Sequence, residues 1–416
     1  MINKTTNFNR SLTIINVLIF IFLLAGCGNS KKAEGTNTPT KLWVGTWSTA
    51  PQLVEPHNNP PKPGLSNNTI RQIVRVSIGG EDIRLRFSNK FSESPVTMKT
   101  VQIAVSKGQS NIDASTIKTL TFNNKEEITM NPGETITSDA FSFNLKPRMD
   151  IAITIYFGET SASVTGHPGS RTTSYILTGN KTSSTDFKNA IKTDHWYVIN
   201  GIDVLTTQPA SAIAILGNSI TDGRGSGTNK QNRWPDILSE RLLKNPKTKK
   251  IGVLNMGIGG NAVLQGGLGP TALDRFERDV LNQHGVKWLI ILEGVNDLGG
   301  TPNAEVANKV ATDLIAAYEK MIDLAHAKNI KVYGATILPF TKSFYYKDYR
   351  EIARNTINNW IRNSGNFDAV IDFDKALRDP EETSTLLPNV HTGDYLHPNE
   401  AGYVMMGEFI DLKLFE

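Results

Sequence analysis

Short stretches of alternating apolar and polar residues fill the first half of the chain after residue 40. Residues 69–79, 82–89 and 100–107 alternate in this way, and the more continuous apolar run 149–158 suits a deeply buried strand. Gly, Asn, Ser or Pro residues bound these stretches, and period-two alternation between such residues is typical of β-strands. The pattern predicts an all-β domain over residues 41–206, of sandwich or jelly-roll-like type.

The pattern changes after residue 210. Continuous apolar runs at 212–217, 251–257 and 286–294 have the character of buried parallel strands, and the segments between them have helical spacing. Alternating strands and helices predict βαβ units, and so an α/β domain over residues 211–416 in which a parallel sheet is flanked by helices in three layers. The helices that we expect in it are 232–245, 272–283, 303–329 and 351–363, with a final helix after residue 399.

A basic and then apolar segment opens the chain. Lys4 and Arg10 precede a mostly apolar run that ends at Cys27, which is the layout of a secretion signal over residues 1–26. The Leu-Ala-Gly-Cys motif ending at Cys27 resembles the lipobox of bacterial lipoproteins, which implies that this thiol takes a lipid. The polar stretch 27–40 is expected to be a tether. We therefore expect a cell-envelope lipoprotein, secreted across the inner membrane and anchored through Cys27.

Length and charge restrict the possible classes. The chain has 416 residues, 39% of them hydrophobic, and single cores stop growing near ~250–300 residues, so two domains are expected. The formal net charge of +4 falls to +2 if Lys4 and Arg10 leave with the signal. The remaining charges are scattered, whereas nucleic-acid binding needs a dense basic patch. We expect no nucleic-acid partner.

Residues with catalytic chemistry follow the predicted strands of the α/β domain. Ser219, Gly260 and Asn296 each come soon after an apolar run, and Asp394 and His397 lie near the C-terminus. Ligands of open α/β sheets bind at the carboxyl ends of the strands, so these residues should meet at one edge. A serine nucleophile needs an imidazole as base and a carboxylate to hold that imidazole. The amides of Ser219 and Gly260 and the side chain of Asn296 are candidate donors to an oxyanion.

Other interpretations of these residues remain open. A serine in a βα loop is a common helix N-cap, and the segment around Ser219 lacks both the G-x-S-x-G elbow and the lysine of a P-loop. His391, Asp394 and His397 recur every three residues and could offer three ligands to zinc. Glycine and asparagine are also ordinary turn residues.

Together, these segments resemble the SGNH, or GDSL-like, hydrolase superfamily. The resemblance spans residues 211–410, and its four blocks stand in the family's order: Gly217-Asn218-Ser219, the glycine loop ending at Gly260, Gly294-Val295-Asn296-Asp297 and Asp394-Tyr395-Leu396-His397. One departure is Asn218, which stands where the family usually has aspartate.

The resemblance implies the role of each residue. Ser219 would be the nucleophile, His397 the general base and Asp394 the carboxylate that orients it. The Ser219 amide, Gly260 and Asn296 would form the oxyanion hole. The family uses no metal, and no cofactor is expected.

The N-terminal module is similar to one found ahead of a bacterial GDSL-like subfamily, through residues 45–51 and 195–204. Its tryptophans raise the idea of sugar stacking at a cleft between the domains, although a tryptophan in a β-domain more often lies in the core. The residues considered are Trp43, Trp47, Trp196 and Trp234.

The expected function is that of a serine esterase that hydrolyses short-chain acyl esters, O-acetyl groups above all, on a small-molecule or polysaccharide substrate. The alternatives are a lysophospholipase or lipase-type acylhydrolase, a zinc-dependent deacetylase, and a non-catalytic carbohydrate-binding lipoprotein.

Overall fold

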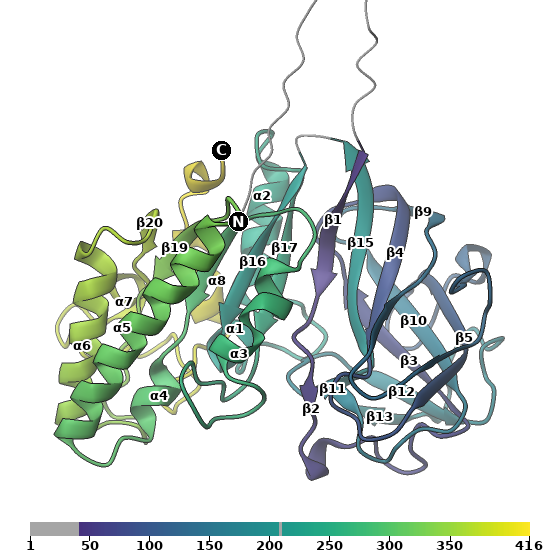
Figure 1. The fold of residues 1–416 in the computed structure, drawn as a ribbon, viewed down its shortest axis with the longest axis horizontal. Helices are drawn as coiled ribbons and strands as arrows, with labels where there is room; N and C mark the ends of the chain where they lie inside the picture. Colours follow the sequence, from purple (N-terminus) through teal and green to yellow (C-terminus); the bar gives the residue numbers. More distant parts are fainter. Residues whose placement is uncertain (1–40, 208–209) are drawn as a thin grey trace, which may run out of the picture. The chain divides into compact units, whose positions relative to one another are not determined.

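A computed structural model describes residues 41–207 and 210–416 of the chain (Figure 1). The expected signal peptide, Cys27 and the tether therefore lie outside the described residues. The sandwich and the α/β part described next belong to one compact unit, Thr40–Glu416. None of the helices in the described part of the chain has the length and hydropathy that a bilayer span needs.

The N-terminal part is a sandwich of antiparallel sheets, as the alternating pattern predicts. One sheet centres on β1 (Lys41–Ser48), β15 (Ile199–Thr207) and β4 (Gly80–Ser88). The other centres on β3 (Asn68–Arg75), β10 (Asp150–Phe157) and β5 (Val96–Val105). Apolar residues of both sheets share one buried core.

Shorter strands complete the sandwich. They are β8 (Thr135–Thr137), β9 (Phe141–Leu145), β6 (Lys118–Thr119), β7 (Ile128–Met130), β12 (Ser174–Thr178) and β13 (Ile191–Thr193). A third, small sheet has the order β14 (Trp196–Tyr197), β11 (Thr165–His167) and β2 (Gln52–Leu53). The loops beside this small sheet reach the edge of the α/β part at which Ser219 lies.

The C-terminal part is a parallel sheet between helices, which confirms the predicted fold class. Its strand order is β17 (Ile251–Gly257), β16 (Ser211–Gly217), β18 (Val286–Leu292), β19 (Lys331–Ala335) and β20 (Ala369–Ile371). Every neighbouring pair in this sheet is parallel. The continuous apolar runs have their explanation here, because both faces of these strands are covered.

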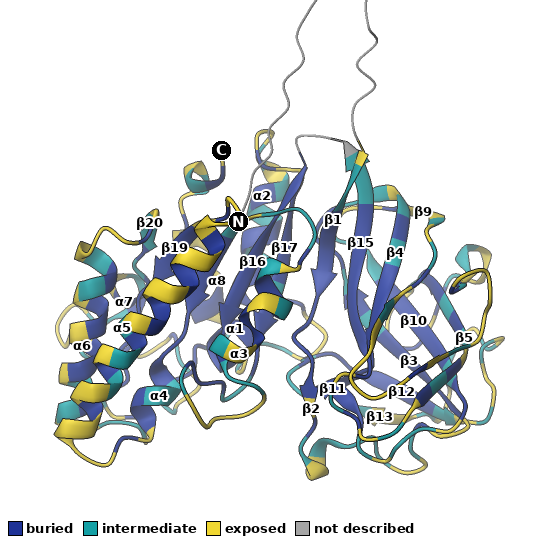
Figure 2. Cartoon of the chain, viewed as in Figure 1, coloured by how far each residue is buried: buried dark blue, intermediate teal, exposed yellow. Residues whose placement is uncertain are grey.

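Helices cover the two faces of this sheet. Ala214 and Leu216 of β16 pack into the core with α5 (Ala304–His326) and α6 (Asp348–Asn363). Ile213 and Ile215 point to the opposite face, where α2 (Trp234–Lys244) and α8 (Glu400–Phe409) lie. Figure 2 shows that α5 and α6 bury one side and expose the other, as amphipathic spacing predicts.

The sandwich packs directly on the edge of the parallel sheet. Strand β1 lies against β17, and the amide of Gly45 donates to the carbonyl of His284 at 2.9 Å. A Cβ at Gly45 would come within 2.8 Å of Leu254, and one at Gly252 within 2.2 Å of the Gly45 carbonyl. The architecture therefore changes near residues 206–211, but the two parts on either side of this boundary pack against each other.

Candidate active site

Ser219 lies at the abrupt turn between strand β16 and helix α1 (Ser219–Asp222). The N-cap of this helix is Asn218, whose Oδ1 accepts a hydrogen bond from the amide of Ile220 at 3.1 Å. The capping role that a serine in this loop could have had thus belongs to its neighbour. The Ser219 hydroxyl is left to face the pocket, with the residue 6% exposed.

A continuous hydrogen-bonded chain joins serine, histidine and aspartate. The Ser219 Oγ lies 2.9 Å from His397 Nε2, and His397 Nδ1 lies 2.6 Å from Asp394 Oδ2. Asp394 also accepts the backbone amide of His397 at 2.9 Å. Since Nδ1–H donates its hydrogen bond to the carboxylate, Nε2 is the nitrogen left to accept the serine proton.

The electrostatics of this chain suit proton transfer. Burial lowers the pKa of His397, and the positive charges of Arg224 and Arg171 lower it further, while Asp394 raises it. Burial by itself would raise the pKa of Asp394, but hydrogen bonds from the amide and ring of His397 hold it well below its usual value. The carboxylate is ionised and the ring is neutral at neutral pH, which is the state a general base requires.

Two of the three predicted oxyanion donors, Gly260 and Asn296, flank Ser219 because β17 and β18 are the two hydrogen-bonded neighbours of β16. Gly260 follows β17 with a φ of +71°, a value that favours glycine. Within residues 41–207 and 210–416, nothing accepts from the amides of Ser219 or Gly260.

Asn296 is the third donor, and two contacts orient its side chain. Its Nδ2 donates to the Asn261 carbonyl at 2.7 Å, and its Oδ1 accepts from the Tyr345 hydroxyl at 2.9 Å. The second N–H of this amide is left for the pocket, which Asn296 lines together with Ser219 and Gly260.

The pocket at Ser219 is built by both parts of the chain. It has a volume of about 330 Å³. The catalytic edge of the parallel sheet forms one side of it. The loops of the sandwich form the other, and contribute Gln52, Glu55, Asn58, Pro168, Arg171 and His195. A substrate at Ser219 would therefore touch the N-terminal module, through these loop residues and through none of the tryptophans considered from the sequence.

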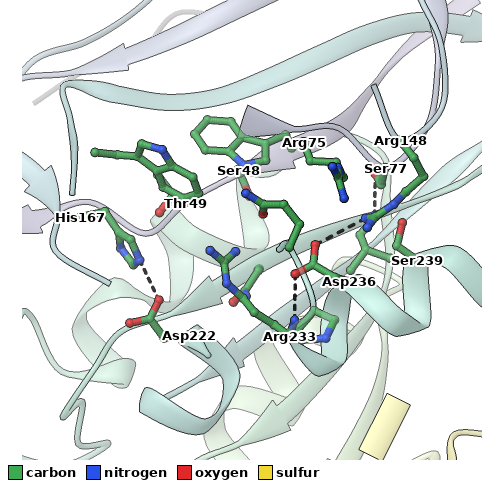
Figure 3. A pocket seen from close by; sticks show the side chains of 16 residues that line it. Ser48, Thr49, Arg75, Ser77, Arg148, His167, Asp222, Arg233, Asp236 and Ser239 are labelled. Atoms are coloured by element: carbon green, nitrogen blue, oxygen red, sulfur yellow. Dashed lines mark hydrogen bonds and ion pairs between the residues drawn. The ribbon is translucent and has the colours of Figure 1, made fainter. Parts of the chain in front are cut away.

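A buried contact between His167 of the N-terminal part and Asp222 also supports the loop after β17 that carries Gly259 and Gly260, here called the oxyanion loop. His167 of β11 lies with Nε2 2.8 Å from Asp222 Oδ1 and Nδ1 2.9 Å from the Ala50 carbonyl (Figure 3). Each ring nitrogen thus lies against one oxygen acceptor, and the two contacts fix the position of the ring. The other oxygen of Asp222 accepts the Gly259 amide at 3.1 Å. A sandwich residue is thus connected, through helix α1, to the residue before Gly260.

The idea that tryptophans stack on a sugar is wrong for Trp47, Trp196 and Trp234, because all three are buried in the core. Trp47, Trp196 and Trp234 are 6%, 2% and 0% exposed, and Trp47 packs edge-on against Trp196. Trp43 lies under the guanidinium of Arg84. The cavity beside Trp47 and Trp196 (Figure 3) has a volume of only about 30 Å³, which is too small for a sugar ring.

The donor geometry does not favour the zinc alternative. No group of three or more His, Cys, Asp or Glu side chains with metal-site geometry occurs in the described part of the chain. His391 uses Nδ1 to accept the Gly393 amide at 3.0 Å and packs against Tyr395. Asp394 is committed to His397. The three residues therefore do not converge on one point.

Asn218 has a structural partner that explains why an amide suits this position. Its Nδ2 donates to Glu293 Oε2 at 3.2 Å, and Glu293 is 1% exposed. Burial raises the pKa of Glu293 to about 8, although Arg275 and Asn218 lower it. An aspartate at position 218 has no N–H group, so it could not donate the hydrogen bond that Glu293 Oε2 accepts from Asn218.

Comparisons with known proteins place the domain. Residues 215–405 match the model of the GDSL-like Lipase/Acylhydrolase family. A GDSL-like lipase from Bacteroides thetaiotaomicron is 22% identical, with a TM-score of 0.36 over 50% of this chain and 92% of that one. A catalytic mutant of Axe2, an acetylxylan esterase from Geobacillus stearothermophilus, is 19% identical, with a TM-score of 0.38 over 49% and 94%. A search of curated proteins gave no match. Residues 215–405 belong to the GDSL-like lipase/acylhydrolase family, and the protein is a carboxylic ester hydrolase.

Proposed function

We propose that this protein hydrolyses short-chain acyl esters, O-acetyl groups above all, through an acyl-enzyme on Ser219. The observation that carries the proposal is the contact of Ser219 Oγ with His397 Nε2 at 2.9 Å and of His397 with Asp394 at 2.6 Å. These distances lie in the range for transfer of a proton along a catalytic triad.

The reaction runs in two halves. Ser219 Oγ attacks the ester carbonyl while its proton passes to His397 Nε2, and the amides of Ser219 and Gly260 with Asn296 Nδ2 stabilise the oxyanion. Collapse of this intermediate expels the alcohol, which takes the proton from His397. Water then attacks the acyl-enzyme and gives a proton to the same nitrogen. Collapse of this second intermediate returns that proton to Ser219 Oγ and releases the acid.

The pocket supports a small acyl group on a polar alcohol such as a carbohydrate. A volume of about 330 Å³ leaves little room for a long acyl chain. Gln52 and Asn58, from the sandwich side of the pocket, offer the polar contacts that a sugar uses.

The test uses residues 28–416 and its Ser219→Ala variant with a fluorophosphonate probe and a series of 4-nitrophenyl esters from acetate to octanoate. Labelling of the parent alone, turnover that resists a chelator, and kcat/KM falling with chain length are the expected results. Labelling or turnover of the variant would refute the nucleophile. A preference for octanoate would favour the lipase-type alternative.

A further inference from the structure

Two arginines that have no side-chain partner among the described residues line the pocket at Ser219. Arg171 lies in the loop after β11 of the sandwich, and Arg224 follows helix α1. Neither guanidinium makes a hydrogen bond or ion pair with any residue in 41–207 or 210–416. Every other arginine in those ranges makes at least one. The thirteen arginines that make such a contact are Arg71, Arg75, Arg84, Arg86, Arg148, Arg233, Arg241, Arg275, Arg278, Arg350, Arg354, Arg362 and Arg378.

Arg171 is the more confined of the two. Its Nε is buried and has no hydrogen-bond partner, although the residue is only half-buried as a whole. A buried donor that stays unpaired costs free energy, and buried polar groups in native proteins almost always have a partner. The N–H fork of a guanidinium matches a carboxylate or phosphate through two parallel hydrogen bonds.

Glu55 and Asp222, which line this pocket, and Asp394, which lies behind His397, are already held by other groups. Glu55 accepts from Gln52 and Asn58 at 3.0 and 2.8 Å. Asp222 pairs with His167 and Asp394 with His397, each within 3 Å. No carboxylate of the described residues lies within ion-pair distance of either arginine, so the two positive charges face the pocket uncompensated.

These charges act on the catalytic base. Arg224 and Arg171 both lower the pKa of His397, so they disfavour the imidazolium that forms when Ser219 loses its proton. An anion bound between the arginines would offset this effect during the reaction. A substrate that carries such an anion would therefore gain in catalysis as well as in binding.

We propose that Arg171 and Arg224 bind an anionic group, a carboxylate or a phosphate, on the alcohol part of the ester substrate beside Ser219. The inference rests on the proposed esterase function and names its substrate class as acidic esters. A carboxylate would come from an acidic sugar, and a phosphate from a phosphorylated polyol.

The experiment compares two matched pairs of acetyl esters. Acetylated methyl glucuronoside is paired with acetylated methyl glucoside, and monoacetyl glycerol 3-phosphate with monoacetyl glycerol. Acetate release gives kcat/KM for the parent, Arg171→Gln, Arg224→Gln and the double variant. We expect the parent to prefer the charged member of one pair by roughly tenfold to a hundredfold, and the pair that shows the preference identifies the anion. The double variant should lose the preference, so that its kcat/KM on the charged and neutral members of that pair becomes equal.

Controls separate binding from damage to the fold. Arg171→Lys keeps the charge and should retain part of the preference, while Arg378→Gln removes a partly exposed arginine outside the pocket and should change nothing. Should the double variant fail to fold, the parent provides the second measurement. Its preference should shrink between 50 and 500 mM salt, and glucuronate or glycerol 3-phosphate should slow fluorophosphonate labelling of Ser219 more than methyl glucoside does.

Two results would overturn the proposal: equal kcat/KM within both pairs, or a preference that survives in the double variant. Normal turnover of the neutral esters alongside either result leaves the esterase function intact. Absence of turnover on all esters, 4-nitrophenyl acetate included, would reject the esterase function and this inference with it.

Discussion

Ser219, His397 and Asp394 differ in the hydrogen bonds that hold them. The carboxylate of Asp394 accepts hydrogen bonds from the backbone amide and from the ring of His397, and these two bonds orient the ring. The serine hydroxyl has one contact of this type, with His397. Loss of each group should therefore have a different cost.

We expect Ser219→Ala and His397→Ala to lower kcat by about 10⁴- to 10⁶-fold, and Asp394→Ala by one to two orders of magnitude less. Serine and histidine carry the proton and the acyl group, whereas aspartate orients the ring. Steady-state kinetics on 4-nitrophenyl acetate measure this, with circular dichroism to check folding. Near-parental turnover in either of the first two variants would contradict the assignment.

Glu293 is a residue whose environment predicts a pH dependence of stability. Burial raises its pKa from 4.5 to about 8 in the folded chain. Between these two values the folded state keeps a proton that the unfolded state has lost, so the free energy of unfolding falls as pH rises, by about 1.4 kcal/mol per pH unit.

Glu293→Gln should remove that slope. Urea unfolding at intervals from pH 5 to 9 should show that the parent loses stability relative to this variant up to about pH 8. Glu408→Gln, which changes an exposed glutamate, is the control and should follow the parent. Parallel curves for the parent and Glu293→Gln would contradict the raised pKa.

At the scale of elements, the parallel sheet and most of its helices could be predicted from periodicity. The segment 303–329 became helix Ala304–His326, since its apolar positions recur at helical spacing. The segment 272–283 is a helix only to Phe276 and then a π-helix over Glu277–Leu281. Its periodicity gave no sign of this change.

The same segment holds Arg275, which is fully buried. Its guanidinium donates to the carbonyls of Met256 at 2.6 Å and Gly217 at 3.1 Å, and lies near Glu293 and Asp279. It thus joins the carboxyl ends of β16 and β17, directly below the catalytic loops. An arginine in an amphipathic pattern would be expected on the exposed face, so sequence reasoning did not single it out.

The contact from β11 to the oxyanion loop predicts a positioning role for His167. In His167→Gln the ion pair with Asp222 is lost, Gly259 is held less firmly, and kcat should fall by about tenfold with little change in KM. This is less than the cost of removing an oxyanion donor outright. The measurement is kcat and KM on 4-nitrophenyl acetate.

His326→Gln provides the matched control, because His326 forms an exposed pair with Asp368 at the same 2.8 Å distance. Activity of this variant should match the parent. A rise in KM with unchanged kcat for His167→Gln, or equal losses in the two variants, would argue against positioning of the oxyanion loop.

At the scale of the whole molecule, the N-terminal module is a wall of the pocket as well as a neighbour of the catalytic domain. Gly45 and Gly252 allow β1 to approach β17, and Leu254 of β17 enters the core of the sandwich. Signals for this packing are weak in the sequence, because a glycine in a strand predicts only that some backbone comes close.

The membrane anchor belongs to the same scale and stays a prediction from the sequence. We expect Cys27→Ser to release the protein from cell membranes without changing the activity of the soluble protein, because the variant lacks the thiol that would take the lipid. Fractionation of cells into membrane and soluble pools, followed by an esterase assay, gives the answer. Retention of the variant in membranes would reject the lipidation.

The sequence by itself determined the classes of the two parts and the candidate residues Ser219, Gly260, Asn296, Asp394 and His397, since strand and helix periods and short motifs are local properties of a chain. Tertiary structure alone decided which distant groups meet. His167, Arg171 and Glu293 carry no local signal, because their roles arise from contacts across the fold with Asp222, the pocket and Asn218. Burial and pairing depend on every element that surrounds a side chain, and periodicity along one segment does not encode them.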